Sequence, residues 1–126
     1  MIREDLSKYS KIITVHLYWV HFYKNHISLI AKDGSTIATE IPLNPYDHPR
    51  MILADFESAR TTLKALMKHH SLSFFKFKAP IALVQIMEPI EANLTKIEIR
   101  AFKELFFDAG MREVKLYNLD GHSIED

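Results

Sequence analysis

The spacing of apolar residues in the C-terminal half of the chain changes twice, from continuous to helical and then to alternating. Residues 81–87 form a short apolar run between two prolines, as expected for a strand with both faces covered. Residues 113–117 alternate between polar and apolar side chains, as a half-covered strand does. Between these two segments, the apolar residues recur at helical spacing: Ile97, Ala101, Phe102, Leu105, Phe106 and Ala109. Residues 79–118 therefore predict a strand, a helix and a strand, with the two strands pairing in parallel.

Both ends of this predicted helix carry capping residues. Thr95 and Glu98 have the spacing of a capping box, in which each side chain accepts a hydrogen bond from a backbone amide, an arrangement worth roughly 1 kcal/mol. Gly110 stands where a left-handed residue closes the last turn, and glycine takes that conformation without steric strain. We therefore expect the helix to begin near Lys96 and to end just before Gly110.

The N-terminal half predicts three antiparallel strands. Residues 12–23 are rich in β-branched and aromatic side chains and predict a strand with bulky residues on both faces. A tight turn at residues 24–26 leads to a second strand at 27–31. An Asp-Gly pair at 33–34 is a strong hairpin signal and predicts a return strand at 36–41. Together these segments predict an antiparallel meander.

The remaining segments complete the predicted order. Residues 42–49 contain three prolines and predict an irregular loop, because proline lacks the amide hydrogen that a helix needs. Asp55 is a candidate N-cap for a helix whose core-facing side chains are Phe56, Ala59, Leu63, Leu66, Met67 and His70. The order indicates an α/β (α+β) fold, a meander followed by helix, strand, helix and strand, in a mixed sheet with two helices. One domain then covers residues 11–118, with an N-terminal arm at 1–10 and a C-terminal tail at 119–126.

Composition and charge exclude several classes of protein. The chain has 126 residues, enough for one domain with a substantial core. Its 16 basic and 16 acidic residues cancel, whereas nucleic-acid-binding proteins carry a basic excess, so we expect no nucleic-acid partner. The absence of cysteine fits a reducing cytoplasm, where we place the protein. We also expect no signal peptide and no membrane span, because the first ten residues are charged and no apolar run is long enough.

Residues 71–78 interleave three phenylalanines with two lysines. Such a pattern can stack nucleic-acid bases on the rings, or it can form an edge segment whose rings tuck under a helix. The short length and the small number of lysines favour the edge segment.

Histidine and serine residues do not combine into a catalytic or metal-binding pattern. A regular strand sends His16 and His21 to opposite faces, and His26 lies in a turn, so we interpret all three as structural. His48 could meet residues 69–70 in space, but no carboxylate or cysteine stands at ligand spacing, which favours a solvated helix end where imidazolium suits the helix dipole. The serines lack the glycines of a nucleophile elbow. We therefore expect no catalytic residue and no bound metal.

The same segments resemble the first subdomain of bacterial actins of the rod-shape-determining MreB type. Residues 52–56 (ILADF) resemble the family's I-A-D-F, residues 95–101 (TKIEIRA) its T-x-V-E-R-R-A, and residues 109–114 (AGMREV) its A-G-A-R-E-V. A weaker similarity covers residues 20–43, and the layout and length also resemble the stress-induced YjaA proteins. The resemblance implies a ribonuclease-H-like, actin-like fold for residues 11–118 and a link with cell shape, the cytoskeleton or stress.

The nucleotide-binding motif of the resembled family is not preserved. Actin-like proteins carry D-x-G-T between their first two strands, where the aspartate organises the metal's water shell and the glycine lets amides approach phosphate. The matching positions here are His21, Phe22, Tyr23 and Lys24. An imidazole does not replace the carboxylate, and the tyrosine ring crowds the phosphate position. The family's E-P-x-A-A segment corresponds to residues 118–121 (NLDG). We therefore expect no bound cofactor and no enzyme activity.

A surplus of bulky apolar residues on the first strand and on one helix flank indicates a candidate interface, formed by Tyr18, Trp19, Phe22, Ile99 and Phe107. In a complete actin, some of this surface would contact other subdomains. Exposed aromatic area would then bind another protein or a second copy of the chain. Alternatively, residues 1–11 and the proline-rich loop cover it.

Three functions remain open. The pattern favours a non-catalytic actin-like domain that acts as a protein-interaction or regulatory module. The alternative is an ATP-binding, polymerising actin homologue that supplies part of a split nucleotide clamp. A ribonuclease-H-like nuclease is the least favoured, because it needs clustered carboxylates for two metal ions and His21 stands where such folds carry an aspartate.

Overall fold

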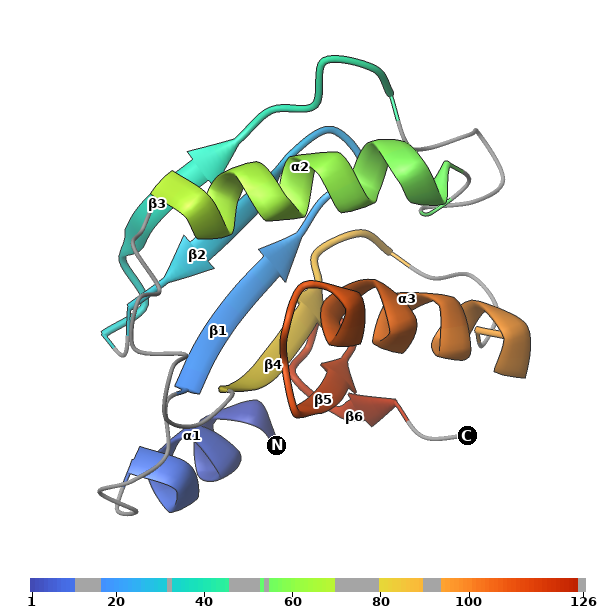
Figure 1. Cartoon of the computed structure of the whole chain (residues 1–126). Helices are drawn as coiled ribbons and strands as arrows, with labels where there is room; N and C mark the ends of the chain where they lie inside the picture. Colours follow the sequence, from blue (N-terminus) through green and yellow to red (C-terminus); the bar gives the residue numbers. More distant parts are fainter. Residues whose placement is uncertain are drawn as a thin grey trace.

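The computed structural model describes residues 1–10, 17–31, 33–45, 53, 55–69, 80–89 and 94–124. Within these ranges the chain forms a mixed sheet of six strands with three helices (Figure 1). The predicted α/β (α+β) class with a mixed sheet is confirmed. The expectation of two helices is wrong, because the N-terminal residues form a third.

The predicted meander consists of β1 (Leu17–Phe22), β2 (Ile27–Ile30) and β3 (Thr36–Glu40), which pair antiparallel in that order. A tight turn joins β1 to β2. Gly34 has a φ of 92° in the turn between β2 and β3, where the absence of a Cβ permits the left-handed conformation. The meander and both turns are thus confirmed, while residues 11–16 of the first predicted strand lie outside the described residues.

The centre of the sheet is β4 (Ile81–Ile86), in which every residue is buried. It lies between β1 and β5 (Glu113–Tyr117) and pairs in parallel with both, within the strand order β3-β2-β1-β4-β5-β6. A strand with six consecutive buried residues needs cover on both faces of the sheet. The parallel pairing predicted for residues 79–118 is confirmed.

Helices α2 (Phe56–His69) and α3 (Lys96–Asp108) cover one face of the sheet, as Figure 1 shows. They enclose the larger core, in which Phe22 of β1 packs edge-to-face on Phe102 of α3 with ring centroids 5.1 Å apart. The positions predicted to face the core from α2 are buried at Ala59, Leu63, Leu66 and Met67. The predicted His70 lies outside the described residues.

The predicted helix caps are present. The amide of Ser58 donates to Asp55 Oδ1 at 2.9 Å at the start of α2. Thr95 and Glu98 form the reciprocal capping box of α3, with both hydrogen bonds at 3.1 Å. Gly110 follows the C-cap with a φ of 106°.

The buried face of α3 agrees with the predicted one at Phe102, Leu105 and Phe106 but differs in the first turn of the helix. Ile97 was expected in the core but is 81 % exposed, whereas Ile99 was expected on a flank and is 2 % exposed. Ile99, Phe102 and Phe106 follow the helical i, i+3, i+7 spacing, and this stripe faces the sheet. Both Ile97 and Ile99 fit the helical period of the buried residues, so spacing alone did not decide which of them faces the sheet.

Helix α1 (Ile2–Ser10) covers part of the other face of the sheet. Alternate residues of a strand point to opposite faces, and Trp19 and Leu83 belong to the second core with α1, whereas Val20 and Val84 belong to the larger core. From α1 this second core buries Ile2 and Leu6. The residues expected to form an N-terminal arm therefore include a helix that packs on the sheet.

The expected C-terminal tail also takes part in the fold. Strand β6 (Ser123–Ile124) pairs antiparallel with the end of β5. The side-chain amide of Gln85 donates to the carbonyl of Leu119 at 2.9 Å. This hydrogen bond attaches the turn before β6 to the central strand of the sheet. Of the helices in the described part of the chain, none has the length and apolarity that crossing a membrane requires.

Candidate functional site

The four positions that match the phosphate loop of the resembled family lie at the end of β1 and in the turn to β2: His21, Phe22, Tyr23 and Lys24. Phe22 is fully buried in the larger core. Tyr23 stacks on His26 with ring centroids 4.0 Å apart and planes 15° from parallel. Aromatic side chains of the chain itself therefore occupy this turn.

The backbone of the turn also has a partner within the chain. The amide of Lys24 donates a hydrogen bond to Glu88 Oε2 at 2.9 Å. Backbone amides in such turns are the donors that bind phosphate in nucleotide-binding loops. Here a carboxylate accepts the hydrogen bond, and its negative charge repels a phosphate group. A nucleotide would have to displace Glu88 from this amide.

His21 lies at the centre of a mixed aromatic and polar cluster on the α1 side of the sheet. Its ring contacts the edge of Trp19, with centroids 5.2 Å apart. The indole Nε1 of Trp19 donates to Gln85 Oε1 at 3.3 Å. His21 Nε2 is buried and has no hydrogen-bond partner among the described residues. Burial lowers the pKa of His21 below its ordinary value, and the neighbouring Gln85 opposes that shift. This environment favours a neutral imidazole.

The structure separates the five residues of the candidate interface. Trp19, Phe22 and Ile99 are only 5 %, 0 % and 2 % exposed, so they contribute to the two cores and offer no docking surface in this fold. Tyr18 is half-buried and packs against the larger core. Phe107 is 46 % exposed. The alternative was that N-terminal residues cover this surface. Helix α1 does cover Trp19, because both contribute to the second core.

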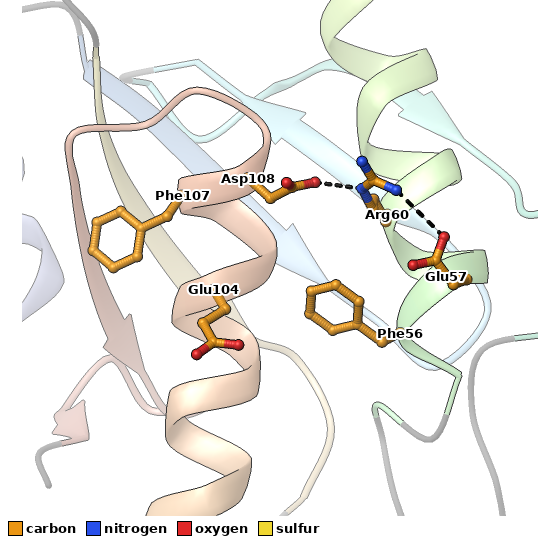
Figure 2. Close-up of a pocket in the computed structure, with 6 residues that line it drawn as sticks. All are labelled: Phe56, Glu57, Arg60, Glu104, Phe107 and Asp108. Atoms are coloured by element: carbon orange, nitrogen blue, oxygen red, sulfur yellow. Dashed lines mark hydrogen bonds and ion pairs between the residues drawn. The ribbon is translucent and has the colours of Figure 1, made fainter.

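The first hollow beside Phe107 is a groove of about 510 Å³ between α2 and α3. Figure 2 shows Phe56 extending from α2 toward α3, with Glu104 on the facing surface of α3. Phe107 also lines the groove, and its ring extends from α3 on the side away from Phe56. Two aromatic rings and four charged side chains therefore line the groove.

An ion-pair network closes one end of the groove. Arg60 of α2 binds Asp108 of α3 through its Nε and Glu57 through a terminal nitrogen at 3.4 Å. Lys64 adds a second cation, with its Nζ 3.6 Å from Asp108 Oδ2. The hydrogen bond from Arg60 holds the pKa of Asp108 below its ordinary value. The two pairs with Asp108 link the helices across the groove, and a dashed line in Figure 2 marks the one with Arg60.

The second hollow, of about 650 Å³, lies on the other side of α3, along β5 and β6. Phe107 lines this hollow as well as the groove. Three cations line this hollow: Lys103 of α3, Arg112 between α3 and β5, and Lys115 of β5. Its acidic residues are Asp5 and Glu113. The exposed ring of Phe107 therefore separates two concave surfaces of different charge.

Sequence reasoning identified Phe107 but missed the residues around it. The charges at Glu57, Arg60 and Lys64 follow helical spacing on one polar face of α2, which was a usable signal for an ion-pair network within that helix. Asp108, which pairs with Arg60 and Lys64, lies on another helix, and nothing local in the sequence connects it with them. Within the described ranges, histidines and carboxylates do not come together in a group of three that could hold a metal ion.

No family model matches the chain, and no curated protein matches it. The function is therefore argued from the geometry around Phe107 and around the turn at residues 21–24.

Proposed function

We propose that this protein is a non-catalytic interaction or regulatory module that binds another protein, or a second copy of itself, through the surface around Phe107. The observation that carries the proposal is the position of this ring, which is 46 % exposed and lines two hollows at once. Partly exposed aromatic side chains beside concave surfaces are the residues that contribute most to binding in protein interfaces.

The two sides of Phe107 support binding rather than catalysis. In the groove between α2 and α3, Arg60 is paired with both Asp108 and Glu57. Paired, solvent-exposed charges orient a partner and exclude wrong ones, whereas catalysis needs groups with strongly shifted protonation beside a reacting atom. The aromatic and polar cluster around His21 lies on the opposite face of the sheet, and His21 lines neither hollow.

We further propose that the domain is actin-like, with a ribonuclease-H-like fold, and that its role is linked to cell shape, the cytoskeleton or stress. The three antiparallel strands followed by helix, strand, helix and strand, with β1, β4 and β5 parallel, support this proposal. Of the sequence segments that resemble the MreB-type actins, residues 95–101 lie at the start of α3 and residues 109–114 lead from α3 into β5, while the described residues Asp55 and Phe56 lie at the start of α2. In this proposal the fold is retained as a binding scaffold, and the turn at residues 21–24 no longer binds nucleotide.

The proposal is tested with two variants that each remove one exposed apolar side chain from α3. Phe107→Ser changes the proposed surface, and Ile97→Ser is the matched control, because Ile97 is more exposed but lines neither hollow. Immobilised wild-type protein, Phe107→Ser and Ile97→Ser are compared for capture of proteins from lysate, and light scattering measures self-association of each.

We expect a captured protein, or a dimer, that is lost in Phe107→Ser and retained in Ile97→Ser. A strictly monomeric protein whose captured proteins are the same for all three forms would contradict the proposal. Circular dichroism of the variants shows that any loss of binding does not result from unfolding.

A further inference from the structure

The groove between α2 and α3 is open to solvent. Four of the residues that line it are exposed and two are half-buried: Glu57, Glu104, Phe107 and Asp108, then Phe56 and Arg60. Its volume of about 510 Å³ is typical of pockets that bind small ligands. A side chain of a partner protein can therefore enter the groove from solvent.

The cation that lines this groove is already engaged within the chain. Arg60 is the one cation among the lining residues, and it pairs with both Asp108 and Glu57. Lys64, beside the groove, also pairs with Asp108. Glu104 forms no hydrogen bond or ion pair with a described residue. Since Arg60 and Lys64 offset two carboxylates, the carboxylate of Glu104 leaves an uncompensated negative charge.

The helical register explains why Glu104 has no cation opposite it. Both helices run in the same direction along the sheet (Figure 1), and Arg60 pairs with Asp108 across the groove. About one helical turn before these two residues stand Phe56 on α2 and Glu104 on α3. Helix α2 therefore presents a phenyl ring at the level where its next turn presents a guanidinium. In Figure 2 the carboxylate of Glu104 lies apart from the ion pairs of Arg60.

A phenyl ring beside a free carboxylate fits the side chain of arginine. The planar guanidinium stacks on an aromatic face and donates two parallel hydrogen bonds to a carboxylate, whereas the ammonium of lysine is a point charge without a plane. Phe56 packs against the larger core, and the ion pair between Arg60 and Asp108 links the two helices. The site is therefore largely formed before a partner binds, which lowers the cost of binding.

We propose that the groove between α2 and α3 binds an arginine of a partner protein, with the guanidinium on the carboxylate of Glu104 and against the ring of Phe56. The arginine supplies at this turn the cation that Arg60 supplies at the next. An apolar residue beside the arginine then contacts Phe107, which lines the same groove. The inference rests on the proposed function, because it names the chemistry of the partner that binds around Phe107.

The test uses a pentapeptide with blocked ends and a central arginine, flanked by leucine and glycine residues. The control peptide has citrulline in place of arginine, which keeps the shape of the side chain and removes its charge. Both are titrated into the full ¹⁵N-labelled chain, and amide chemical shifts locate and quantify the binding. We expect shifts concentrated at residues 56–60 and 104–108, and affinity at least about threefold lower for the citrulline peptide.

Two variants assign the binding to its residues. Glu104→Gln should weaken binding of the arginine peptide about threefold. The control Glu98→Gln carries the same change of charge on α3 and should not weaken it, because Glu98 does not line the groove. Phe56→Leu should also weaken binding about threefold, because leucine retains apolar volume but offers no ring to the guanidinium. Phe56 lines this groove and not the hollow along β5, so its effect separates the two, and amide spectra of the free variants show that each is folded.

The proposal is overturned if the arginine peptide causes no localised shifts, if the citrulline peptide binds equally well, or if the shifts fall in the hollow along β5. It is also overturned if the groove amides of the protein alone shift with its concentration, because a second copy would then occupy the groove. Partner capture that depends on Phe107 would leave the proposed function intact after such a failure, since Phe107 also lines the other hollow. Peptide binding in the groove without that capture would instead overturn the proposed function and keep the arginine site.

Discussion

The backbone amide of Ile2 donates a hydrogen bond to the carbonyl oxygen of Gly121 at 2.9 Å. The side chain of Ile2 also packs close to Gly121, because a Cβ placed on Gly121 would lie 3.2 Å from Ile2 Cγ2. Gly121 has a φ of 86° in the turn between β5 and β6. This contact joins the first turn of α1 to the segment that leads into the last described strand.

Gly121→Ala should destabilise the protein by about 1–3 kcal/mol, because alanine is strained at a positive φ and its Cβ would press on Ile2. Gly34→Ala is the matched control, since Gly34 has a φ of 92° but no atom near the new Cβ. Urea unfolding measures both. The excess loss in Gly121→Ala should shrink when Ile2→Ala removes the contacting methyl group, and an unchanged excess would contradict the contact.

Leu6→Ala should lower the free energy of unfolding by about 2 kcal/mol, because Leu6 is buried between α1 and the sheet. Leu43→Ala is the control: its side chain is 96 % exposed, so the change should remain within about 0.5 kcal/mol. Chemical denaturation followed by Trp19 fluorescence reports directly on the second core. Equal stability of both variants would show that α1 is not docked in solution.

Thr95→Ala should cost about 1 kcal/mol through loss of the α3 N-cap. Glu98→Gln should cost much less, because glutamine also accepts the hydrogen bond that the backbone amide of Thr95 donates. Thermal unfolding of the two variants distinguishes them. A larger loss in Glu98→Gln than in Thr95→Ala would contradict the reciprocal capping box.

Stability should fall as the pH drops below the ordinary histidine pKa of about 6.5, because burial lowers the pKa of His21 in the folded protein. At a pH between the folded and the unfolded pKa of His21, the unfolded chain binds more protons than the folded protein. The stabilising contribution of the neutral imidazole is therefore fully present above the unfolded pKa and decreases as the pH falls. His21→Phe should therefore lose less stability than the wild type between about pH 7.5 and pH 5.5.

The pKa of His26 is also lowered by burial, but this residue is present in both proteins. The difference between their pH slopes therefore reports on His21. Parallel slopes in urea unfolding would contradict the assignment of a buried, neutral imidazole at His21.

Isothermal calorimetry with Mg-ATP should give no heat beyond dilution. Phe22 is buried, Tyr23 stacks on His26, and Glu88 accepts the amide hydrogen bond of Lys24. Glu88→Gln removes the repelling charge and serves as the comparison. Measurable affinity in the wild type would support the split nucleotide clamp instead of the proposed interaction module.

Much of the fold was predictable because its signals are local. Asp55 and Thr95 as N-caps, Gly110 after α3 and the Asp-Gly turn each act within a few residues of the chain. The apolar run of β4 likewise predicted a central strand, because its β-branched residues lie between prolines.

The candidate site was less predictable because exposure depends on distant segments. Trp19 and Phe22 were interpreted as surplus apolar surface, yet α1 covers the first and α3 covers the second. Phe107 and Ile99 were both predicted to lie on one flank of α3, but only Phe107 is exposed. The orientation of α3 on the sheet decides between them, and several side-chain stripes satisfy the same helical period.

The sequence by itself determined strands β1 to β5, the start of α2 and both ends of α3, because backbone preferences and side-chain chemistry depend on nearby residues. Only the tertiary structure decided that α1 packs on the second face, that β6 pairs with β5, and that Arg60 meets Asp108 beside Phe107. These features join segments far apart in the chain, and the burial free energy that stabilises them depends on which surfaces meet after folding.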